Sequence, residues 1–300
     1  MPISTKLFND QAINRFNQLT ADIQSTQSKV ATGKNVVRAS DDPIAAANIA
    51  FTKDQKVMLD RFDTNIDRAR TRLNLAENML SETMNVVTRI YELTIQARND
   101  SLSAVDRQAI GIEVSELRDT LAGFANSRDS AGNYLFSGYK SNQQPFVETD
   151  VGTIEFHGDR GVHSVQISET LRANTGLDGA DLFMRVDTDN GTQPLFDIVD
   201  KLASDLEGGV INESSIAEME KVVDHIAIQQ THVGSQLSKI DRQENVIERR
   251  VLLMEENLSA LEDADLARLV TDLQSQIVSR DAAQQAFVKI GQQSLFDYIR

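Results

Sequence analysis

The sequence predicts a mainly α protein: a long antiparallel helical rod or coiled coil, with terminal helical arms paired together and a small central β-rich domain. Two observations support this fold class. Apolar residues recur at helical spacing over long stretches at both ends of the 300-residue chain. Strand-like alternation with many turn residues occurs only between these stretches. The two ends must therefore meet after the chain has run out and returned.

The terminal arms, residues 1–40 and 266–300, each carry one apolar stripe on an otherwise amide-rich surface. An amphipathic helix gains most of its stability from a packed partner, so we expect the arms to pair as a coiled coil. The alternative is that they are flexible polar tails. We favour pairing that other subunits complete. The residues expected to form this subunit-assembly interface are Phe16, Leu19, Ile23, Val30, Leu266, Val270, Leu273, Ile277, Phe287 and Leu295.

Residues 41–138 and 193–265 are expected to form a helical rod domain. Asp42 is a good N-cap, and Pro43 suits the first helical position because its missing N–H costs nothing there. A long apolar stripe without proline follows. The acidic run at 262–265 interrupts the returning stripe and separates the rod from the C-terminal arm.

A short turn near residue 100 is expected to fold the first half of the rod into an antiparallel helical hairpin. Ser103 can cap the second helix, and Asp106 lies three residues on, the spacing of a capping box.

Residues 139–192 are expected to form a β-rich outer domain. The runs 153–156 and 162–167 alternate with a period of two on either side of Gly158-Asp159-Arg160-Gly161, which predicts a hairpin between them.

Charge is concentrated in this part of the chain. Residues 148–220 carry sixteen acidic and four basic side chains, most of the net charge of −15. Such a surface is solvated and self-repelling. We therefore expect residues 148–185 to be the outermost and least constrained part of the protein.

Composition excludes several functions. Without cysteine there is no disulfide, Cys-based zinc site or thiol nucleophile. The acidic balance disfavours nucleic acid as a partner, and no apolar run approaches membrane-spanning length. The N-terminus does not resemble a cleaved secretory signal. We expect a protein that stays in the cytosol or leaves the cell by a route that uses no such signal.

The candidates for chemistry have simpler structural interpretations. His157 and His163 flank a turn, but a metal site needs more ligands. Asp41 and Asp42 precede a proline and are typical of a helix cap. The run 187–191 lacks the ligand spacing of a calcium loop. We expect no catalytic residue, no cofactor and no metal site, so the protein is not an enzyme.

Several motifs, taken in order, carry a family resemblance. They are Val30-Ala31-Thr32-Gly33-Lys34, Ala39 to Ala47, Asp106 to Ile110, Ala125 to Asp129, Gly132 to Gly138, Glu262 to Leu266 and Ser294 to Tyr298. Together they resemble the bacterial flagellin superfamily over nearly the whole chain. Within it, Tyr134-Leu135-Phe136-Ser137-Gly138, Pro145-Phe146 and the ending Leu295-Phe296-Asp297-Tyr298 are similar to the branch that joins hook and filament.

The resemblance implies a structural subunit of the bacterial flagellum at the hook–filament junction. Such a protein is exported unfolded through the flagellar type III apparatus, with an export chaperone, and folds on assembly. Its implied partners are further copies in a homo-oligomer ring, an adjacent hook-associated junction protein, and flagellin. The alternatives are a filament flagellin, or a secreted coiled-coil component of another type III secretion machine.

Overall fold

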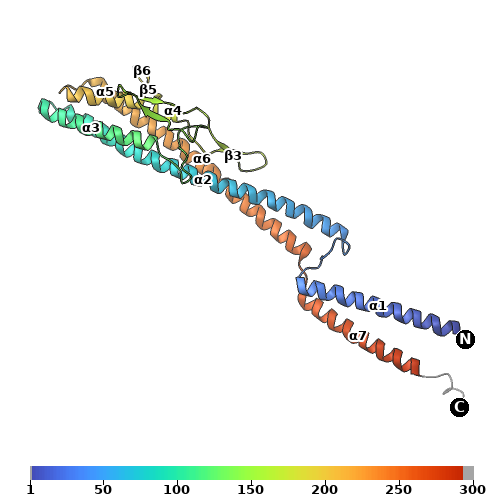
Figure 1. The fold of residues 1–300 in the computed structure, drawn as a ribbon. Helices are drawn as coiled ribbons and strands as arrows, with labels where there is room; N and C mark the ends of the chain where they lie inside the picture. The colour runs from blue at the N-terminus through green and yellow to red at the C-terminus, as the bar shows by residue number, and fades with distance from the viewer. Residues whose placement is uncertain (1, 293–300) are drawn as a thin grey trace, which may run out of the picture. The chain divides into compact units, whose positions relative to one another are not determined.

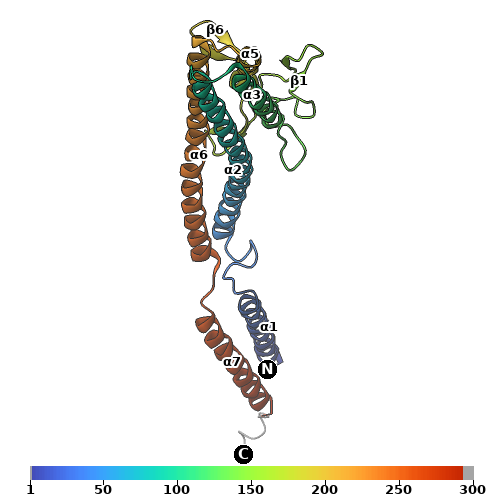
Figure 2. The same cartoon turned by 90° about the vertical axis from the view of Figure 1, so that its left-hand side faces the viewer.

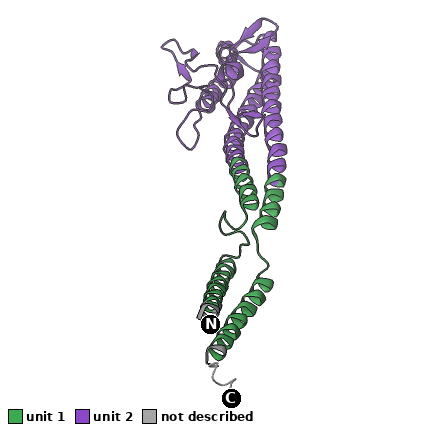
Figure 3. Ribbon diagram, turned by 90° about the vertical axis from the view of Figure 1, so that its right-hand side faces the viewer, with its two compact units in different colours: residues 1–58, 249–300 green, residues 59–248 purple. Residues whose placement is uncertain are grey.

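The computed structural model describes residues 2–292, and the chain divides into two compact units (Figure 3). Unit 1 combines residues 1–58 with 249–300, and unit 2 is residues 59–248. The boundary falls inside two long helices, so each of these helices contributes to both units. The prediction of a mainly α fold with long packed helices is confirmed, and the β structure consists of small two-stranded sheets.

Unit 1 is built from two terminal helices and the ends of two others. Helices α1 and α7 lie side by side in both Figure 1 and Figure 2, and they run antiparallel. The backbone N–H of Ala264 donates to the carbonyl of Gly33 at 3.0 Å at one end of the pair. The rings of Phe16 and Phe287 meet further along it. The predicted pairing of the arms is therefore confirmed. The helices are α1 (Pro2–Thr32), α2 (Pro43–Ala97), α6 (Glu213–Glu262) and α7 (Leu266–Gln292).

Local signals set the helix boundaries as predicted. The Asp42 carboxylate accepts hydrogen bonds from the backbone N–H groups of Ile44 and Ala45 at 3.0 and 2.9 Å, so α2 begins with an N-cap. Ser103 and Asp106 form a reciprocal capping box at the start of α3 (Ala104–Ala125). Both predictions are confirmed.

Unit 2 contains the main hydrophobic core. Helices α2, α3, α5 (Leu195–Glu207) and α6 contribute apolar stripes to it. Helix α3 approaches α5 so closely that a Cβ added at Gly111 would lie 2.9 Å from the backbone nitrogen of Glu207. Only glycine fits at this crossing. The stripe predicted for α2 is buried at every position: Leu59, Phe62, Ile66, Ala69, Leu73, Ala76, Leu80, Val87, Ile90 and Ala97.

The β-rich segment consists of three separate two-stranded antiparallel sheets and one short helix. Each sheet pairs strands that are consecutive in the chain, so every sheet is a hairpin. The strands are β1 (Phe146–Glu148) with β2 (Ile154–Phe156), β3 (Ser164–Gln166) with β4 (Arg172–Asn174), and β5 (Val186–Thr188) with β6 (Gly191–Gln193); the helix is α4 (Gly179–Phe183).

The predicted hairpin between 153–156 and 162–167 is wrong, because β2 pairs with β1 and β3 pairs with β4. The intervening glycine-rich loop has another partner. The Asp159 carboxylate accepts the backbone N–H groups of Tyr139 and Gly161 at 2.9 and 2.7 Å, which ties the loop to the segment around residue 139. These hydrogen bonds also lower the pKa of Asp159.

The expectation that 148–185 is the outermost and least constrained part stays a prediction, but several of its side chains are well packed. The ring of Phe183 is fully buried and packs 5.6 Å from Phe136 and 5.8 Å from Phe196, measured between centroids. Ile167 is likewise fully buried. Aromatic packing therefore joins this segment to the loop that follows α3 and to helix α5.

Candidate assembly interface

Unit 1 buries few of its apolar side chains within one chain. Among the described residues of this unit, Ile23 (5% exposed) and Ile49 (8%) are the only hydrophobic side chains that are buried. All the other buried hydrophobic side chains in the described part of the chain belong to unit 2. A unit with so little core gains little free energy from folding alone.

The structure brings two of the predicted interface residues together across the contact between α1 and α7. Phe16 and Phe287 meet edge to face, with ring centroids 5.8 Å apart. Ile23 is buried, whereas Leu266 and Val270 are exposed. Leu295 lies outside the described residues. The half-buried members are Phe16, Leu19, Val30, Leu273, Ile277 and Phe287. Their contact with other subunits stays a prediction.

A second set of apolar side chains is exposed on unit 1 and was missed by the sequence reasoning. These residues lie off the single stripe that pairs the arms, so a search for one periodic face passes over them. A count of the apolar residues left outside that face could have found them. They are Leu7, Ile13, Ile44, Phe51, Val57, Leu252, Leu253, Val278 and Val288.

A three-residue clamp joins the two links of unit 1. The Glu262 carboxylate accepts hydrogen bonds from the ammonium groups of Lys34 and Lys53, the latter at 3.0 Å. Beside it, the backbone N–H of Asn35 donates to the carbonyl of Glu262 at 2.7 Å. The hydrogen bond from Lys34 is the main reason that the pKa of Glu262 lies below its ordinary value, and burial opposes the shift. The clamp holds the α1–α2 link against the α6–α7 link.

A buried arginine organises the β1–β2 hairpin in unit 2. The Arg118 guanidinium of α3 contacts the carboxylates of Asp200 at 2.8 Å and Glu148 at 2.9 Å, and it donates to the carbonyl of Gly152 at 2.5 Å. Burial disfavours its charge, but the hydrogen bonds to Asp119, Asp200 and Glu148 outweigh burial and raise its pKa. Arg118 therefore stays charged and fixes the hairpin against α3 and α5.

The sequence candidates for chemistry have structural partners. Nε2 of His163 lies 3.1 Å from the carbonyl oxygen of Gly138, and Nε2 of His157 lies 3.3 Å from the Glu155 carboxylate. Within residues 2–292, no three His, Cys, Asp or Glu side chains gather as a metal ion would require. In the same part of the chain, no helix combines the length and apolar character needed to cross a membrane.

Comparison with known proteins agrees with the motifs. Residues 3–141 match the model of the bacterial flagellin N-terminal helical region. The chain is 25% identical to flagellar hook-associated protein 3 of Salmonella typhimurium, with 100% of both chains covered. It is 24% identical to flagellar hook-associated protein 3 of Escherichia coli, with 99% of both covered. It is 26% identical to flagellin of Bacillus subtilis, with 95% of both covered.

Solved structures share the fold. One is flagellar hook-associated protein 3 of Legionella pneumophila, with a TM-score of 0.67 at 19% identity over 71% of this chain and 98% of that chain. Another is FlgL of Xanthomonas campestris, with a TM-score of 0.63 at 21% identity over 69% of this chain and 99% of that chain. Residues 3–141 therefore carry the flagellin N-terminal helical region. The chain is similar over its full length to flagellar hook-associated protein 3.

Proposed function

We propose that this chain is the structural subunit that forms the junction between hook and filament of a bacterial flagellum. The single observation that carries the proposal is that unit 1 has almost no hydrophobic core within one chain. Among the described residues of unit 1, one chain buries only Ile23 and Ile49 of its hydrophobic side chains and leaves many large apolar side chains in water. Full-length similarity to flagellar hook-associated protein 3 supports the choice of junction over other assemblies.

The domain organisation that goes with this function follows the sequence. The arms, 1–40 and 266–300, form the inner assembly domain. The rod domain, 41–138 and 193–265, lies outside it, and residues 139–192 form the β-rich outer domain. Copies close into a ring that meets an adjacent hook-associated junction protein on one side and flagellin on the other. The role is structural, without catalysis, a cofactor or nucleic acid.

Folding of unit 1 coupled to assembly is the proposed mechanism. Fully burying a side chain such as Phe51 or Ile44 contributes about 1.5–3 kcal/mol. Ordering each residue of the arms costs about 1–2 kcal/mol of backbone entropy. One chain supplies too few contacts to offset that cost, whereas neighbouring copies add apolar surface. The chain would then be exported unfolded, escorted by a flagellar export chaperone, and would complete its arms only at the growing tip outside the cell.

A filament flagellin is the second candidate, because the chain is also 26% identical to Bacillus subtilis flagellin over 95% of both chains. A secreted coiled-coil component of another type III machine is a third, since helical periodicity alone does not distinguish it. Both alternatives predict a different partner in an assembly experiment.

Electron microscopy tests the three candidates together. Purified protein is incubated with filament seeds and, separately, with hook ends that carry the preceding junction protein. We expect a short cap on the hook ends that stops growing by itself. Long filaments from the seeds would overturn the proposal in favour of a flagellin. Binding to neither would point to another secretion machine.

A further inference from the structure

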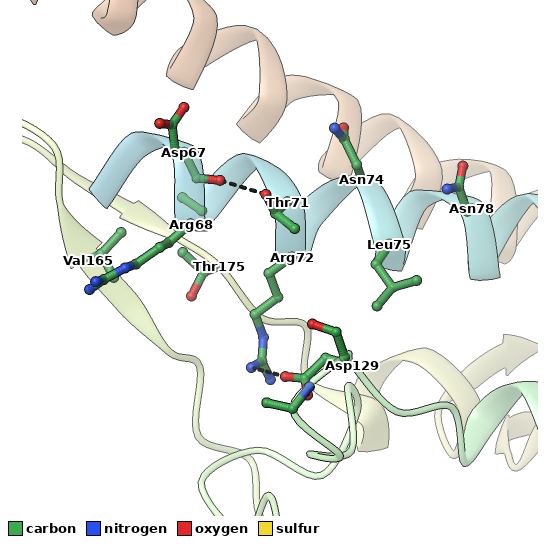
Figure 4. Close-up of a pocket in the computed structure, with 13 residues that line it drawn as sticks. Asp67, Arg68, Thr71, Arg72, Asn74, Leu75, Asn78, Asp129, Val165 and Thr175 are labelled. Carbon is green, nitrogen blue, oxygen red and sulfur yellow. Dashed lines mark hydrogen bonds and ion pairs between the residues drawn. The ribbon is translucent and has the colours of Figure 1, made fainter. Parts of the chain in front are cut away.

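A groove of about 870 Å³ lies in unit 2 on one face of α2 (Figure 4). Its other walls are the turn at residues 129–131 and the β3–β4 hairpin. Leu75 and Val165 give it apolar surface, and Asn74 and Asn78 line it with amide groups. The groove therefore combines apolar contact with hydrogen-bonding capacity, as a site for a polypeptide segment does.

The groove is lined by two acidic and two basic side chains, Asp67, Asp129, Arg68 and Arg72, and one of the basic ones is unpaired. Arg68 is exposed and makes no ion pair or hydrogen bond within the described part of the chain. Arg72 contacts the Asp129 carboxylate at 3.4 Å through Nη1, while its Nε and Nη2 are buried without a hydrogen-bond partner. Unpaired buried N–H groups are costly, so an occupant that brings an acceptor is favoured.

The β1–β2 turn has the matching chemistry. Val151 at its tip is 88% exposed, more than any other large hydrophobic side chain whose exposure the structure describes. The neighbouring Asp150 carboxylate is exposed and has no partner among the described residues. Because Val151 is in solvent, the turn does not fill the groove of its own chain.

Hydrogen bonds and backbone geometry define the conformation of the turn. The backbone N–H of Thr149 donates to the carbonyl of Thr153 at 2.9 Å, and the two hydroxyl groups lie 2.8 Å apart. Gly152 adopts a φ of +87°, which a β-branched or bulky residue would not tolerate. The Arg118 guanidinium also donates a hydrogen bond to the carbonyl of Gly152. A turn ordered in advance loses little entropy on docking.

We propose that the β1–β2 turn of one copy docks in the α2 groove of a second copy. The Asp150 carboxylate meets Arg68 and Arg72, and the Val151 side chain packs on the apolar wall at Leu75. The two surfaces are different parts of the same chain, so the contact is heterologous and closes into a ring when the rotation between copies closes. The inference rests on the proposed ring, and it identifies a lateral contact outside the terminal arms.

Cysteine cross-linking tests the contact, since the chain has no cysteine of its own. Full-length Val151→Cys and Asn78→Cys chains with different tags are bound together to hook ends and oxidised. We expect disulfide-linked dimers that carry both tags. The matched control replaces Val151→Cys with Val105→Cys, an exposed valine at the start of α3. That pair is expected to give no mixed dimer.

Reversing the charges on the turn and in the groove gives an independent test of the contact. Asp150→Arg and Arg68→Asp are each expected to lower occupancy of hook ends about tenfold, the effect of about 1.4 kcal/mol. The double variant restores occupancy, because its turn and groove again carry opposite charges. Asp189→Arg makes the same charge change on the exposed β5–β6 turn and is expected to leave occupancy unchanged.

The outcomes separate this contact from the proposed function. Unmodified protein that does not bind hook ends overturns the junction role and this inference with it. Normal binding without the mixed dimer overturns the turn-in-groove contact alone. Equal occupancy for Asp150→Arg and Asp189→Arg also overturns it.

Discussion

Unit 1 and unit 2 share the same two long helices but differ in how much core they hold. Along α6, the stripe in unit 2 is fully buried at Val222, Ile226 and Val233. In unit 1 the same stripe is only half-buried at Met254 and Leu258. The amphipathic pattern continues while the burial falls. A periodic apolar face therefore predicts that a helix will be packed, but not whether its own chain supplies the packing.

The difference between the units separates stability from assembly. Unit 2 holds nearly all the buried hydrophobic side chains of the described residues, whereas unit 1 leaves many of its large apolar side chains exposed. Substitutions in unit 2 should lower the free energy of unfolding of the isolated chain. Substitutions in unit 1 should mainly affect incorporation. The four predictions below test this separation.

The largest effect is expected from Phe16→Asp. A carboxylate at the contact between Phe16 and Phe287 cannot be buried without a large cost, so incorporation into hook ends should be lost. Unit 2 should stay folded, with its helical circular dichroism signal intact. Val105→Asp, at an exposed site in unit 2, is the control and should incorporate normally. Normal incorporation of Phe16→Asp would contradict coupled folding and assembly.

A pair of Phe→Ala substitutions should give opposite results in the two units. Phe183→Ala removes a fully buried ring from the aromatic cluster of unit 2 and should destabilise the isolated chain by about 3–5 kcal/mol. Phe51→Ala removes a ring that is 66% exposed in unit 1 and should change stability by about 0.5 kcal/mol or less.

The two Phe→Ala variants are compared by urea unfolding and by occupancy of hook ends. We expect Phe51→Ala to lower occupancy although its unfolding curve matches the parent. Equal loss of stability in the two variants would show that unit 1 has a core of its own.

Helix caps allow a smaller comparison. Ser103→Ala breaks the capping box of α3 in unit 2 and should lower the free energy of unfolding by about 1 kcal/mol. Asp42→Ala removes the N-cap of α2 in unit 1, where the isolated chain gains little from a well-formed helix end. Its urea midpoint should stay close to that of the parent. A similar drop for both caps would argue that the two units unfold together.

Sequence reasoning succeeded where the determining interactions are local. The α2 stripe, the Asp42 cap and the Ser103 capping box depend on residues a few positions apart. It failed at the hairpins, because alternation does not say which strand is the partner. The turn at Gly152 joins β1 to β2. The loop at Asp159, which was expected to close a hairpin, is instead hydrogen-bonded to the backbone of Tyr139.

Parts of the candidate sites could not be predicted from sequence patterns, because they bring together residues that are far apart in the sequence. Lys34 and Glu262 of the clamp are 228 positions apart. The groove brings Arg72 of α2 against Asp129 of a turn and Val165 of a strand. No spacing rule connects such positions. The predicted interface residues could be found from the sequence because each arm has its own apolar periodicity. Whether other subunits cover them stays a prediction.

The smallest expected effect concerns the clamp at Glu262, which should make the links of unit 1 sensitive to acid. The pKa of Glu262 is lower in the folded chain than in the unfolded one, so its carboxylate stabilises the clamp above its ordinary pKa of about 4.3. That contribution is lost as the pH falls through the lowered value.

In protein bound to hook ends, Glu262→Gln should therefore speed hydrogen exchange at the amides of Asn35 and Ala264 near pH 7. The difference from the parent should shrink as the pH falls through the lowered pKa of Glu262. Because both lysines are partly exposed, the effect should be on the order of 1 kcal/mol or less. Glu255→Gln removes the partner of Lys56 on the outside of unit 1 and is the matched control, with no change expected at these two amides. Equal exchange in Glu262→Gln and the parent at pH 7 would mean that the backbone hydrogen bonds hold the links without the clamp.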